Sequence, residues 1–275
     1  MRRSPLARDR YALYEAAVQG VEFDLDFFER VYRHLRGGRF RLFREDFCGT
    51  AQLACAWALR RPENRSWGVD LDPEPLAWVR THRLARMREA ARRVTLIERD
   101  VREVSRPRVD VVCALNFSYW VFRERETLRS YFRSVKRSLR KDGLLFVNLF
   151  GGTEALDELV ETRRIPPTQG PDGLRIPGFV YRWEHVAFNV IDHHIRCAIH
   201  FRFADGTEKR RAFTYDWRLW TLPEVQEVMQ EAGFRSTRVY VEAWDHEKDE
   251  PAEWYRHQKW FDNQEGWLAF VVGLA

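Results

Sequence analysis

The sequence has few cysteines and lacks the features of exported and membrane proteins. Its 275 residues include four cysteines, Cys48, Cys55, Cys113 and Cys197, and none of them forms a CxxC pair. We therefore expect free thiols in a reducing compartment rather than a disulfide framework. No apolar run approaches the ~20 residues that cross a bilayer, and the opening MRRSPLARDR lacks the apolar segment of a signal peptide. A cytoplasmic location without a membrane partner is expected.

The basic excess is small and is spread along the chain. The net charge is +5 at pH 7, and arginines alternate with acids, as in RERETLRSYFRSVKRSLRKD. Such a mixture is typical of a solvated helix face, whereas a nucleic-acid surface concentrates one sign of charge. Nucleic acid is thus the less favoured partner. Hydrophobic residues make up 45% of the chain, which is enough to build a full core.

Residues 41–70, RLFREDFCGTAQLACAWALRRPENRSWGVD, have the pattern of a βαβ unit. An apolar run ends at Glu45, a turn follows at Gly49, and an amphipathic segment leads to a second apolar run that ends at Asp70. In such units a small residue at the turn lets the backbone approach a ligand, and an acidic residue about 20 positions later accepts hydrogen bonds from ribose hydroxyls. The spacing therefore predicts a nucleoside site.

Strands and helices are expected to alternate through the first half of the chain. Helical spacing covers Tyr11–Leu35, and the connections between the following strands have room for helices. This alternation predicts an α/β fold with a mostly parallel sheet and helices on both faces. The strand candidates are Phe40–Glu45, Ser66–Asp70, Val94–Glu98, Val109–Asn116 and Gly143–Phe150.

The second half is expected to begin with an inserted antiparallel sheet. A short helix at Glu154–Thr162 and a loop rich in proline and glycine, ending at Gly178, come first. The strand candidates of the insert are Phe179–Phe188, His193–Phe203 and Lys209–Trp217. A helix at Pro223–Ala232 and strands at Thr237–Ala243 and Trp267–Leu274 are expected to complete the chain.

Five short motifs occur in the order expected for one superfamily. They are EDFCGTA after the first strand, GVDLD after the second, ERDV after the third, NFSYW after the fourth and LRKDGLLFVNLF leading into the fifth. Over residues 40–275 this order resembles the class I S-adenosylmethionine-dependent methyltransferase superfamily, and a subgroup of uncharacterised bacterial chains is also similar. The resemblance implies a Rossmann-like sheet of seven strands, the last antiparallel, with an inserted antiparallel β cap.

The resemblance also implies a division of the chain into four parts. Residues 1–38 would be lid helices, 39–150 the cofactor-binding core, 151–220 the inserted substrate cap, and 221–275 the C-terminal part of the core.

The resemblance implies S-adenosylmethionine as the cofactor and S-adenosylhomocysteine as its product. Glu45 and Gly49 match the acid and the central glycine of the superfamily's GxGxG turn, whereas Phe47 and Ala51 occupy positions where outer glycines are usual. Asp70 would hold the ribose through charge-assisted hydrogen bonds, which are the stronger kind. The expected cofactor-binding residues are Glu45, Phe47, Cys48, Gly49, Thr50, Asp70, Leu71, Asp100, Val101, Asn116 and Phe117.

Two of these polar positions, and the neighbouring Asp72, have a second interpretation. Thr50 is equally suited to cap the following helix, and Asp100 to lie in an exposed turn. Asp72 precedes Pro73, so we expect it to cap the next helix rather than to bind the cofactor.

The NFSY sequence at residues 116–119 follows the fourth strand, where the methyl group should meet its acceptor. It resembles, without the prolines, the NPPY motif of relatives that methylate exocyclic amines of nucleic acids. In the alternative interpretation, Asn116 and Ser118 contact the cofactor tail or backbone while Tyr119 and Trp120 form a pocket wall. Packing alone is a further interpretation for Trp120.

Two other residues complete the expected acceptor site. Arg218 in YDWRLW should lie near the cleft, either to clamp an anionic group or to pin the connection. Tyr11 lies in the expected lid helix, although core packing explains its spacing equally well. The expected substrate-binding residues are thus Tyr11, Tyr119, Trp120 and Arg218.

The catalytic residue is not identified by the sequence, and four candidates for a general base remain. They are Tyr14, His194, His200 and Asp216. His194 and His200 share one strand face by period two, but no third ligand has suggestive spacing, so no metal is predicted.

These expectations lead to one preferred function. An inserted sheet and a lid helix would enclose a compact acceptor rather than leave an open groove for a polymer. The sequence therefore predicts an enzyme, a methyltransferase that acts on a small molecule by in-line transfer. Methylation of RNA or DNA, and a non-catalytic cofactor-binding regulator, are the alternatives. The acceptor atom and the oligomeric state are not predicted.

Overall fold

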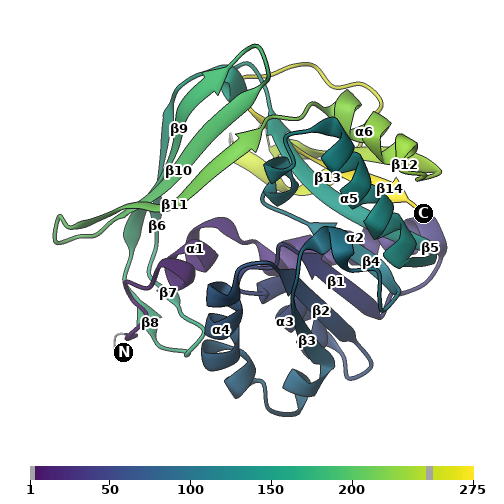
Figure 1. Cartoon of the computed structure of the whole chain (residues 1–275). Coiled ribbons are helices and arrows are strands. Elements are labelled where there is room, and N and C mark those ends of the chain that lie inside the picture. The colour runs from purple at the N-terminus through teal and green to yellow at the C-terminus, as the bar shows by residue number, and fades with distance from the viewer. Residues whose placement is uncertain (1–3, 246–249) are drawn as a thin grey trace.

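The computed structural model describes residues 4–245 and 250–275 and contains two main sheets (Figure 1). The larger sheet has eight strands in the order β13-β12-β14-β5-β4-β1-β2-β3, and the smaller has four in the order β11-β10-β9-β6. Residues 1–3 of the expected lid and 246–249 of the expected C-terminal part lie outside the described residues. Within the described ranges, no helix has the length and apolar character to cross a membrane.

Five neighbouring strands of the large sheet are parallel, as the βαβ pattern predicted. Their carboxyl ends therefore meet at one edge of the sheet, which is where ligands bind in open α/β folds. The strands are β1 (Leu42–Asp46), β2 (Arg65–Asp70), β3 (Val94–Glu98), β4 (Val109–Ala114) and β5 (Leu139–Gly151).

The remaining strands of the large sheet confirm the expected antiparallel end and correct its strand count. Strand β14 (Trp267–Leu274) pairs antiparallel with β5, and β12 (Ser236–Asp245) pairs antiparallel with β14. An additional strand, β13 (Glu250–His257), extends the edge beyond β12, so the sheet has eight strands rather than the expected seven. The sequence around β13 is polar and aromatic and lacks the alternation that identifies a strand.

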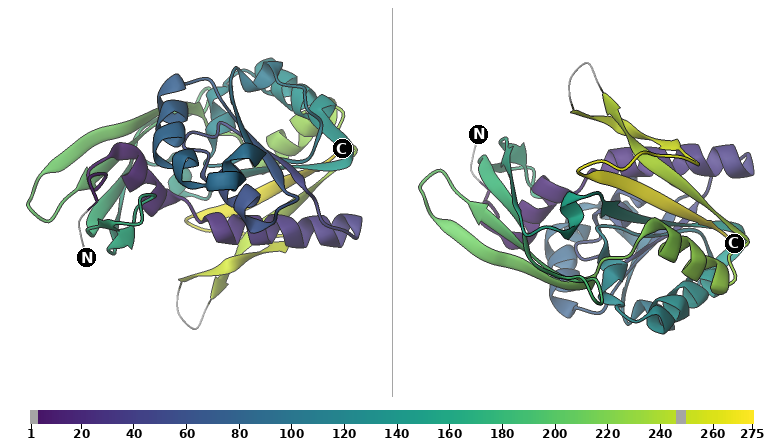
Figure 2. Two further views of the ribbon diagram at one scale, coloured as in Figure 1. Left: turned by 90° about the horizontal axis from the view of Figure 1, so that it is seen from below. Right: turned by 90° about the horizontal axis from the view of Figure 1, so that it is seen from above.

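Helices cover both faces of the large sheet (Figure 2). On one face α2 packs Phe27 and Phe28 against Phe146 of β5 and Phe270 of β14. On the other face α5 and α6 contribute to the largest hydrophobic cluster. The helices are α1 (Arg10–Val18), α2 (Val21–Arg36), α3 (Gln52–Arg60), α4 (Pro73–His82), α5 (Arg125–Ser138) and α6 (Leu222–Glu231). Short 3-10 helices are η1 (Leu84–Arg86), η2 (Arg88–Arg93), η3 (Val101–Glu103), η4 (Ser118–Val121) and η5 (Glu154–Leu156).

The packing of α2 corrects the expected lid. Its buried side chains Leu25, Phe27, Phe28 and Val31 belong to the core of the sheet, so α2 is a core helix. Helix α1 instead lies between the large sheet and the cap (Figure 1). Of the two helices described in residues 1–38, only α1 has a position that fits the expected lid.

The cap is an antiparallel sheet formed by β6 (Val160–Ile165), β9 (Phe179–Asn189), β10 (His194–Arg202) and β11 (Glu208–Arg218). Strand β6 corrects the helix expected at Glu154–Thr162, because only a 3-10 turn forms before the chain becomes extended. All but the last residue of β6 are exposed, so this edge strand shows no buried alternation in the sequence. A small hairpin of β7 (Thr168–Gln169) and β8 (Arg175–Ile176) occupies the expected loop.

Contacts at both ends of α1 fix its place over the large sheet. Asp9 caps the helix by accepting hydrogen bonds from the Tyr11 and Ala12 amides, and the same carboxylate oxygen accepts a bond from Trp78 Nε1 of α4. Glu15 of α1 is buried and forms an ion pair with Arg83, directly after α4. The helix therefore connects the cap to the βαβ unit.

A buried polar network supports the carboxyl end of β1. Arg44 and Asp46 are both fully buried, and Asp46 Oδ2 accepts hydrogen bonds from Arg44 and from the Tyr131 hydroxyl, each at 2.9 Å. Arg44 also donates to the Val104 carbonyl oxygen at 2.9 Å. A buried charge that loses its partner is strongly destabilising, so this network should fix the end of β1.

We expect Asp46→Ala to lower the free energy of unfolding by about 3–5 kcal/mol, because it leaves the Arg44 guanidinium buried and without its carboxylate. Tyr131→Phe removes one hydrogen bond from the same carboxylate and should lower it by about 1 kcal/mol. Urea unfolding followed by circular dichroism measures both values. A smaller loss for Asp46→Ala than for Tyr131→Phe would contradict this interpretation.

Candidate active site

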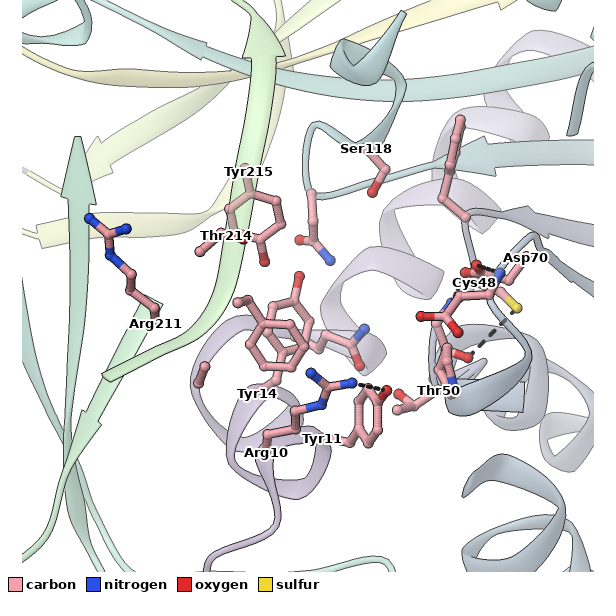
Figure 3. Close-up of a pocket in the computed structure, with 18 residues that line it drawn as sticks. Arg10, Tyr11, Tyr14, Cys48, Thr50, Asp70, Ser118, Arg211, Thr214 and Tyr215 are labelled. Atoms are coloured by element: carbon pink, nitrogen blue, oxygen red, sulfur yellow. Dashed lines mark hydrogen bonds between the residues drawn. The ribbon is translucent and has the colours of Figure 1, made fainter. Parts of the chain in front are cut away.

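A pocket of about 400 Å³ lies between the carboxyl edge of the large sheet, helix α1 and strand β11 of the cap (Figure 3). The residues from the large sheet and its connections are Phe47, Cys48, Gly49, Thr50, Asp70, Asp72, Pro75, Asn116 and Ser118. Those from or next to α1 are Arg10, Tyr11, Tyr14 and Gln19, and those from β11 are Arg211, Ala212, Phe213, Thr214 and Tyr215.

The turn after β1 has the backbone geometry that its glycine pattern implied, although two glycines are replaced. The φ angle is 55° at Phe47, 50° at Gly49 and 48° at Ala51, so all three alternate positions are left-handed. Glycine adopts this region freely, whereas other residues pay a conformational cost. The Phe47 ring packs against Phe122 and Tyr131, which helps to hold the strained residue in place.

Asp70 at the end of β2 is bonded directly to this turn. Its Oδ2 accepts a hydrogen bond from the Gly49 amide at 2.7 Å, and its Oδ1 accepts one from the Asp72 amide at 3.0 Å. Burial raises the pKa of the Asp70 carboxyl, and the two amides act in the opposite direction. Asp72 caps α4 by accepting from the Glu74 amide, as predicted, and it also lines the pocket.

Glu45 lies beneath the turn rather than on the pocket wall. Its side chain is buried, and Oε2 accepts a hydrogen bond from the Ala54 amide in the first turn of α3 at 2.8 Å. Burial raises the pKa of this carboxyl to about 8. Glu45 therefore supports the start of α3, and the structure does not bring it to the pocket as a cofactor ligand.

The residues after β4 separate into one that faces the pocket and one that faces the core. Asn116 and Phe117 are both left-handed, with φ angles of 52° and 58°. Asn116 lines the pocket, whereas the Phe117 ring packs against Trp120 and Phe150. The Phe117 amide donates to Asn148 Oδ1 at 3.3 Å, which ties this turn to β5.

Two tyrosines form the side of the pocket opposite the strand ends. Tyr14 of α1 and Tyr215 of β11 point toward one another, with Thr50 and Asp70 across the pocket (Figure 3). Burial raises the pKa of both hydroxyls well above the ordinary tyrosine value. Both phenols therefore stay protonated at neutral pH and can donate and accept hydrogen bonds.

Several expected site residues lie away from this pocket. Leu71 is 68% exposed, Asp100 is paired with Arg102, and Val101 is buried in the core. Tyr119 and Trp120 correct the expected acceptor wall, because both are fully buried within the largest hydrophobic cluster. An aromatic sequence after a strand does not distinguish a pocket wall from a core position.

The polar candidates in the cap also lie elsewhere. His194 pairs with Asp216 at 2.8 Å, and His200 pairs with Glu184 at 2.8 Å, on the strand face opposite Ile195 and Ile199. Arg218 donates a hydrogen bond to Glu224 at 2.9 Å and stacks on Trp220. It therefore holds the connection between β11 and α6 in place rather than entering the pocket. Of the four general-base candidates, the structure thus brings Tyr14 to the pocket wall. Among the described residues, no group of three metal-ligating side chains is present.

The sequence motifs did not predict most of the pocket wall that comes from α1 and β11. Gln19, Phe213, Thr214 and Tyr215 line the pocket, yet they are far in sequence from the nucleoside motifs. The alternation along β11 did signal one inner face, since Phe213 and Tyr215 follow period two with buried Trp217. Which face closes the pocket depends on how the cap packs against α1.

Comparisons with known proteins agree with this geometry. Residues 48–145 match the methyltransferase domain family. A comparison with curated proteins found no match. Among solved structures, an amino pentose methyltransferase from Micromonospora echinaspora with bound S-adenosylmethionine has a TM-score of 0.66 at 17% identity, with 96% of each chain covered.

Two further structures are similar over nearly the whole chain. A methyltransferase from Clostridium acetobutylicum that depends on S-adenosylmethionine has a TM-score of 0.65 at 15% identity and covers 94% of this chain and 95% of its own. A sugar N-methyltransferase from a Streptoalloteichus species has a TM-score of 0.60 at 17% identity and covers 100% of this chain and 95% of its own. The chain therefore has the class I methyltransferase fold, as the motifs predicted, and residues 48–145 are similar to the methyltransferase domain family.

The raised pKa of Glu45 predicts a specific pH dependence of stability. Because its folded pKa is about 8 and its ordinary value is 4.5, Glu45 is protonated in the fold when the unfolded chain is already ionised. Its contribution is fully present below pH 4.5 and is lost as the pH rises to about 8. Because of Glu45, wild type should lose up to about 1.4 kcal/mol of unfolding free energy per pH unit in this window. The Glu45→Gln variant should lack this loss.

Urea unfolding of wild type and Glu45→Gln between pH 5 and pH 8 measures this effect. The exposed Glu63→Gln is the control and should leave the pH dependence unchanged. Parallel stability curves for wild type and Glu45→Gln would show that Glu45 is ionised in the folded protein throughout.

Proposed function

We propose that the protein is an S-adenosylmethionine-dependent methyltransferase whose acceptor is a small molecule with an amino group. The observation that carries the proposal is the half-open pocket at the carboxyl edge of the sheet, where Asp70 meets the turn at Gly49 beneath α1. A volume of about 400 Å³ lies in the range of small-molecule sites.

The donor set of the pocket suits an adenosyl ligand. A carboxylate has about four acceptor positions, and backbone amides use two of those on Asp70, so positions remain for both ribose hydroxyls. Pro75 and the Asp72 segment line the same end of the pocket and would contact the base. The turn from Phe47 to Ala51, which is left-handed at alternate residues, would present its backbone to the part of the ligand that follows the ribose.

When bound, S-adenosylmethionine would supply a methyl group that is already activated for displacement. The protein then mainly has to align the acceptor and exclude water. Helix α1 and β11 cover the pocket on the side away from the sheet, and Tyr11, Tyr14, Phe213 and Tyr215 supply aromatic faces there. Such faces attract cationic groups, and they also keep the site dry.

Arg10 and Arg211 balance the two carboxylates of the pocket wall, so the choice of an amine as the acceptor rests on the lack of a carboxylate or histidine beyond the nucleoside end. Among the described wall residues the carboxylates are Asp70 and Asp72, both at the nucleoside end, and no histidine is present. A hydroxyl acceptor requires a general base, whereas a neutral amine already carries the lone pair that attacks. Tyr14, Tyr215 and Asn116 can orient such an amine through neutral hydrogen bonds. Amino-sugar and sugar N-methyltransferases are among the similar structures, which supports this choice.

Asp70→Ala should reduce the affinity for S-adenosylhomocysteine by at least about a hundredfold, because two charge-assisted hydrogen bonds to the ribose are lost. Isothermal titration calorimetry measures the affinity, and circular dichroism checks that the fold is intact. Asp192→Ala, an exposed carboxylate in the β9–β10 turn, is the control and should bind like wild type. Equal affinity of Asp70→Ala and wild type would place the nucleoside elsewhere.

The activity is tested by incubating the protein with methyl-labelled S-adenosylmethionine and cell extract separated into metabolite, RNA, DNA and protein fractions. We expect label in the metabolite fraction, in compounds that cation exchange retains, and none with Asp70→Ala. Label confined to RNA, DNA or protein would refute the small-molecule acceptor. Tight binding of the cofactor without transfer to any fraction would instead indicate a regulator.

A further inference from the structure

Gln19 presents a buried hydrogen-bond acceptor to the pocket. It directly follows α1 and lines the pocket wall, and its amide oxygen Oε1 is buried without a hydrogen-bond partner among the described residues. A buried polar atom that lacks a partner costs free energy in the unliganded protein. Such an atom on a pocket wall indicates that the ligand supplies the missing donor.

The position of Gln19 along α1 indicates which part of the ligand it meets. At the start of the helix, Arg10 bonds Glu74 of α4 at 2.7 Å, close to Asp70 and Asp72 at the ribose end. A helical rise of 1.5 Å per residue places Gln19 about 13 Å further along. From there the chain enters α2, which packs on β1, β4 and β5, so Gln19 lies at the end of the pocket beyond the ribose.

The carboxylates in and beneath the pocket are all engaged away from one charged part of the expected ligand. An adenosyl cofactor carries an amino-acid tail with an ammonium group, which requires hydrogen-bond acceptors. Glu45, the carboxylate expected near this tail, is buried and bonded to the Ala54 amide. Asp70 and Asp72 are held at the ribose end by the Gly49, Asp72 and Glu74 amides.

We propose that Gln19 is a cofactor-binding residue whose amide oxygen accepts a hydrogen bond from the ammonium group of the cofactor's amino-acid tail. This inference rests on the proposed function. It assigns to the residue that follows the lid helix a contact that the buried Glu45 does not supply. A hydrogen bond from a charged donor is stronger than a neutral one, so a single amide makes a measurable contribution.

The test compares two nucleosides that differ in the tail. S-adenosylhomocysteine carries the ammonium and carboxylate groups, and 5′-methylthioadenosine lacks both, while each has a neutral sulfur. Their dissociation constants are measured by calorimetry for wild type, Gln19→Leu and Gln19→Glu. Gln52→Leu is the matched control, because Gln52 also has a buried amide oxygen without a described partner but does not line the pocket.

Gln19→Leu should weaken the affinity for S-adenosylhomocysteine by about tenfold or more. Its affinity for 5′-methylthioadenosine should stay within about twofold of wild type. Gln19→Glu keeps an accepting oxygen and should retain the affinity for S-adenosylhomocysteine, and Gln52→Leu should bind both nucleosides like wild type. Because 5′-methylthioadenosine also reports an intact pocket, its binding separates a lost contact from a misfolded variant.

Two results with the Gln19→Leu variant would overturn the assignment of Gln19. One is an equal loss of affinity for both nucleosides in Gln19→Leu, and the other is no loss for either. If wild type binds neither nucleoside, the proposed function itself fails and this inference fails with it. If wild type binds both nucleosides with the same affinity, the tail makes no net contribution and the role of Gln19 is refuted while nucleoside binding stands.

Discussion

The hydrogen bond from the Gly49 amide to the Asp70 carboxylate joins the turn after β1 to the end of β2, and the geometry of the site depends on it. Adjacent parallel strands bring the two residues together, although they are 21 positions apart in the chain. The turn approaches Asp70 because its alternate residues adopt left-handed backbone conformations. The same carboxylate also accepts a hydrogen bond from the Asp72 amide, so it fixes the start of α4 as well as the turn. One side chain therefore organises the floor of the pocket.

Two segments that are distant in sequence cover part of this floor and turn it into a pocket. Helix α1 is held to α4 by Asp9, Arg10 and Glu15, and its other side packs against the inner face of the cap. Strand β11 contributes Phe213 and Tyr215, whose rings lie against α1 or next to it. The cover is aromatic and its phenols are neutral, which suits a reaction in which the donor is already activated. Under the proposed function, the large sheet would bind the nucleoside, and α1 with β11 would select the acceptor.

The sequence predicted the parts of this structure that depend on local pattern. Strand β3 begins and ends where the alternation placed it, and Asp70 lies at the strand end and on the pocket wall as its spacing indicated. Positions that depend on tertiary packing could not be predicted in the same way. Glu45 and Trp120 belong to strongly predicted motifs, yet their side chains point into the protein interior. Strand β6 was missed because an exposed edge strand has no apolar face to reveal it.

The central claim is that an adenosyl ligand lies across the edge where β1 and β2 end, beneath α1. A crystal structure of the protein grown with S-adenosylhomocysteine tests this most directly. The account predicts density for the nucleoside in this pocket, with both ribose hydroxyls within hydrogen-bond distance of Asp70 and the amino-acid tail directed toward Gln19. A nucleoside bound at another surface, or a ribose turned away from Asp70, would contradict it.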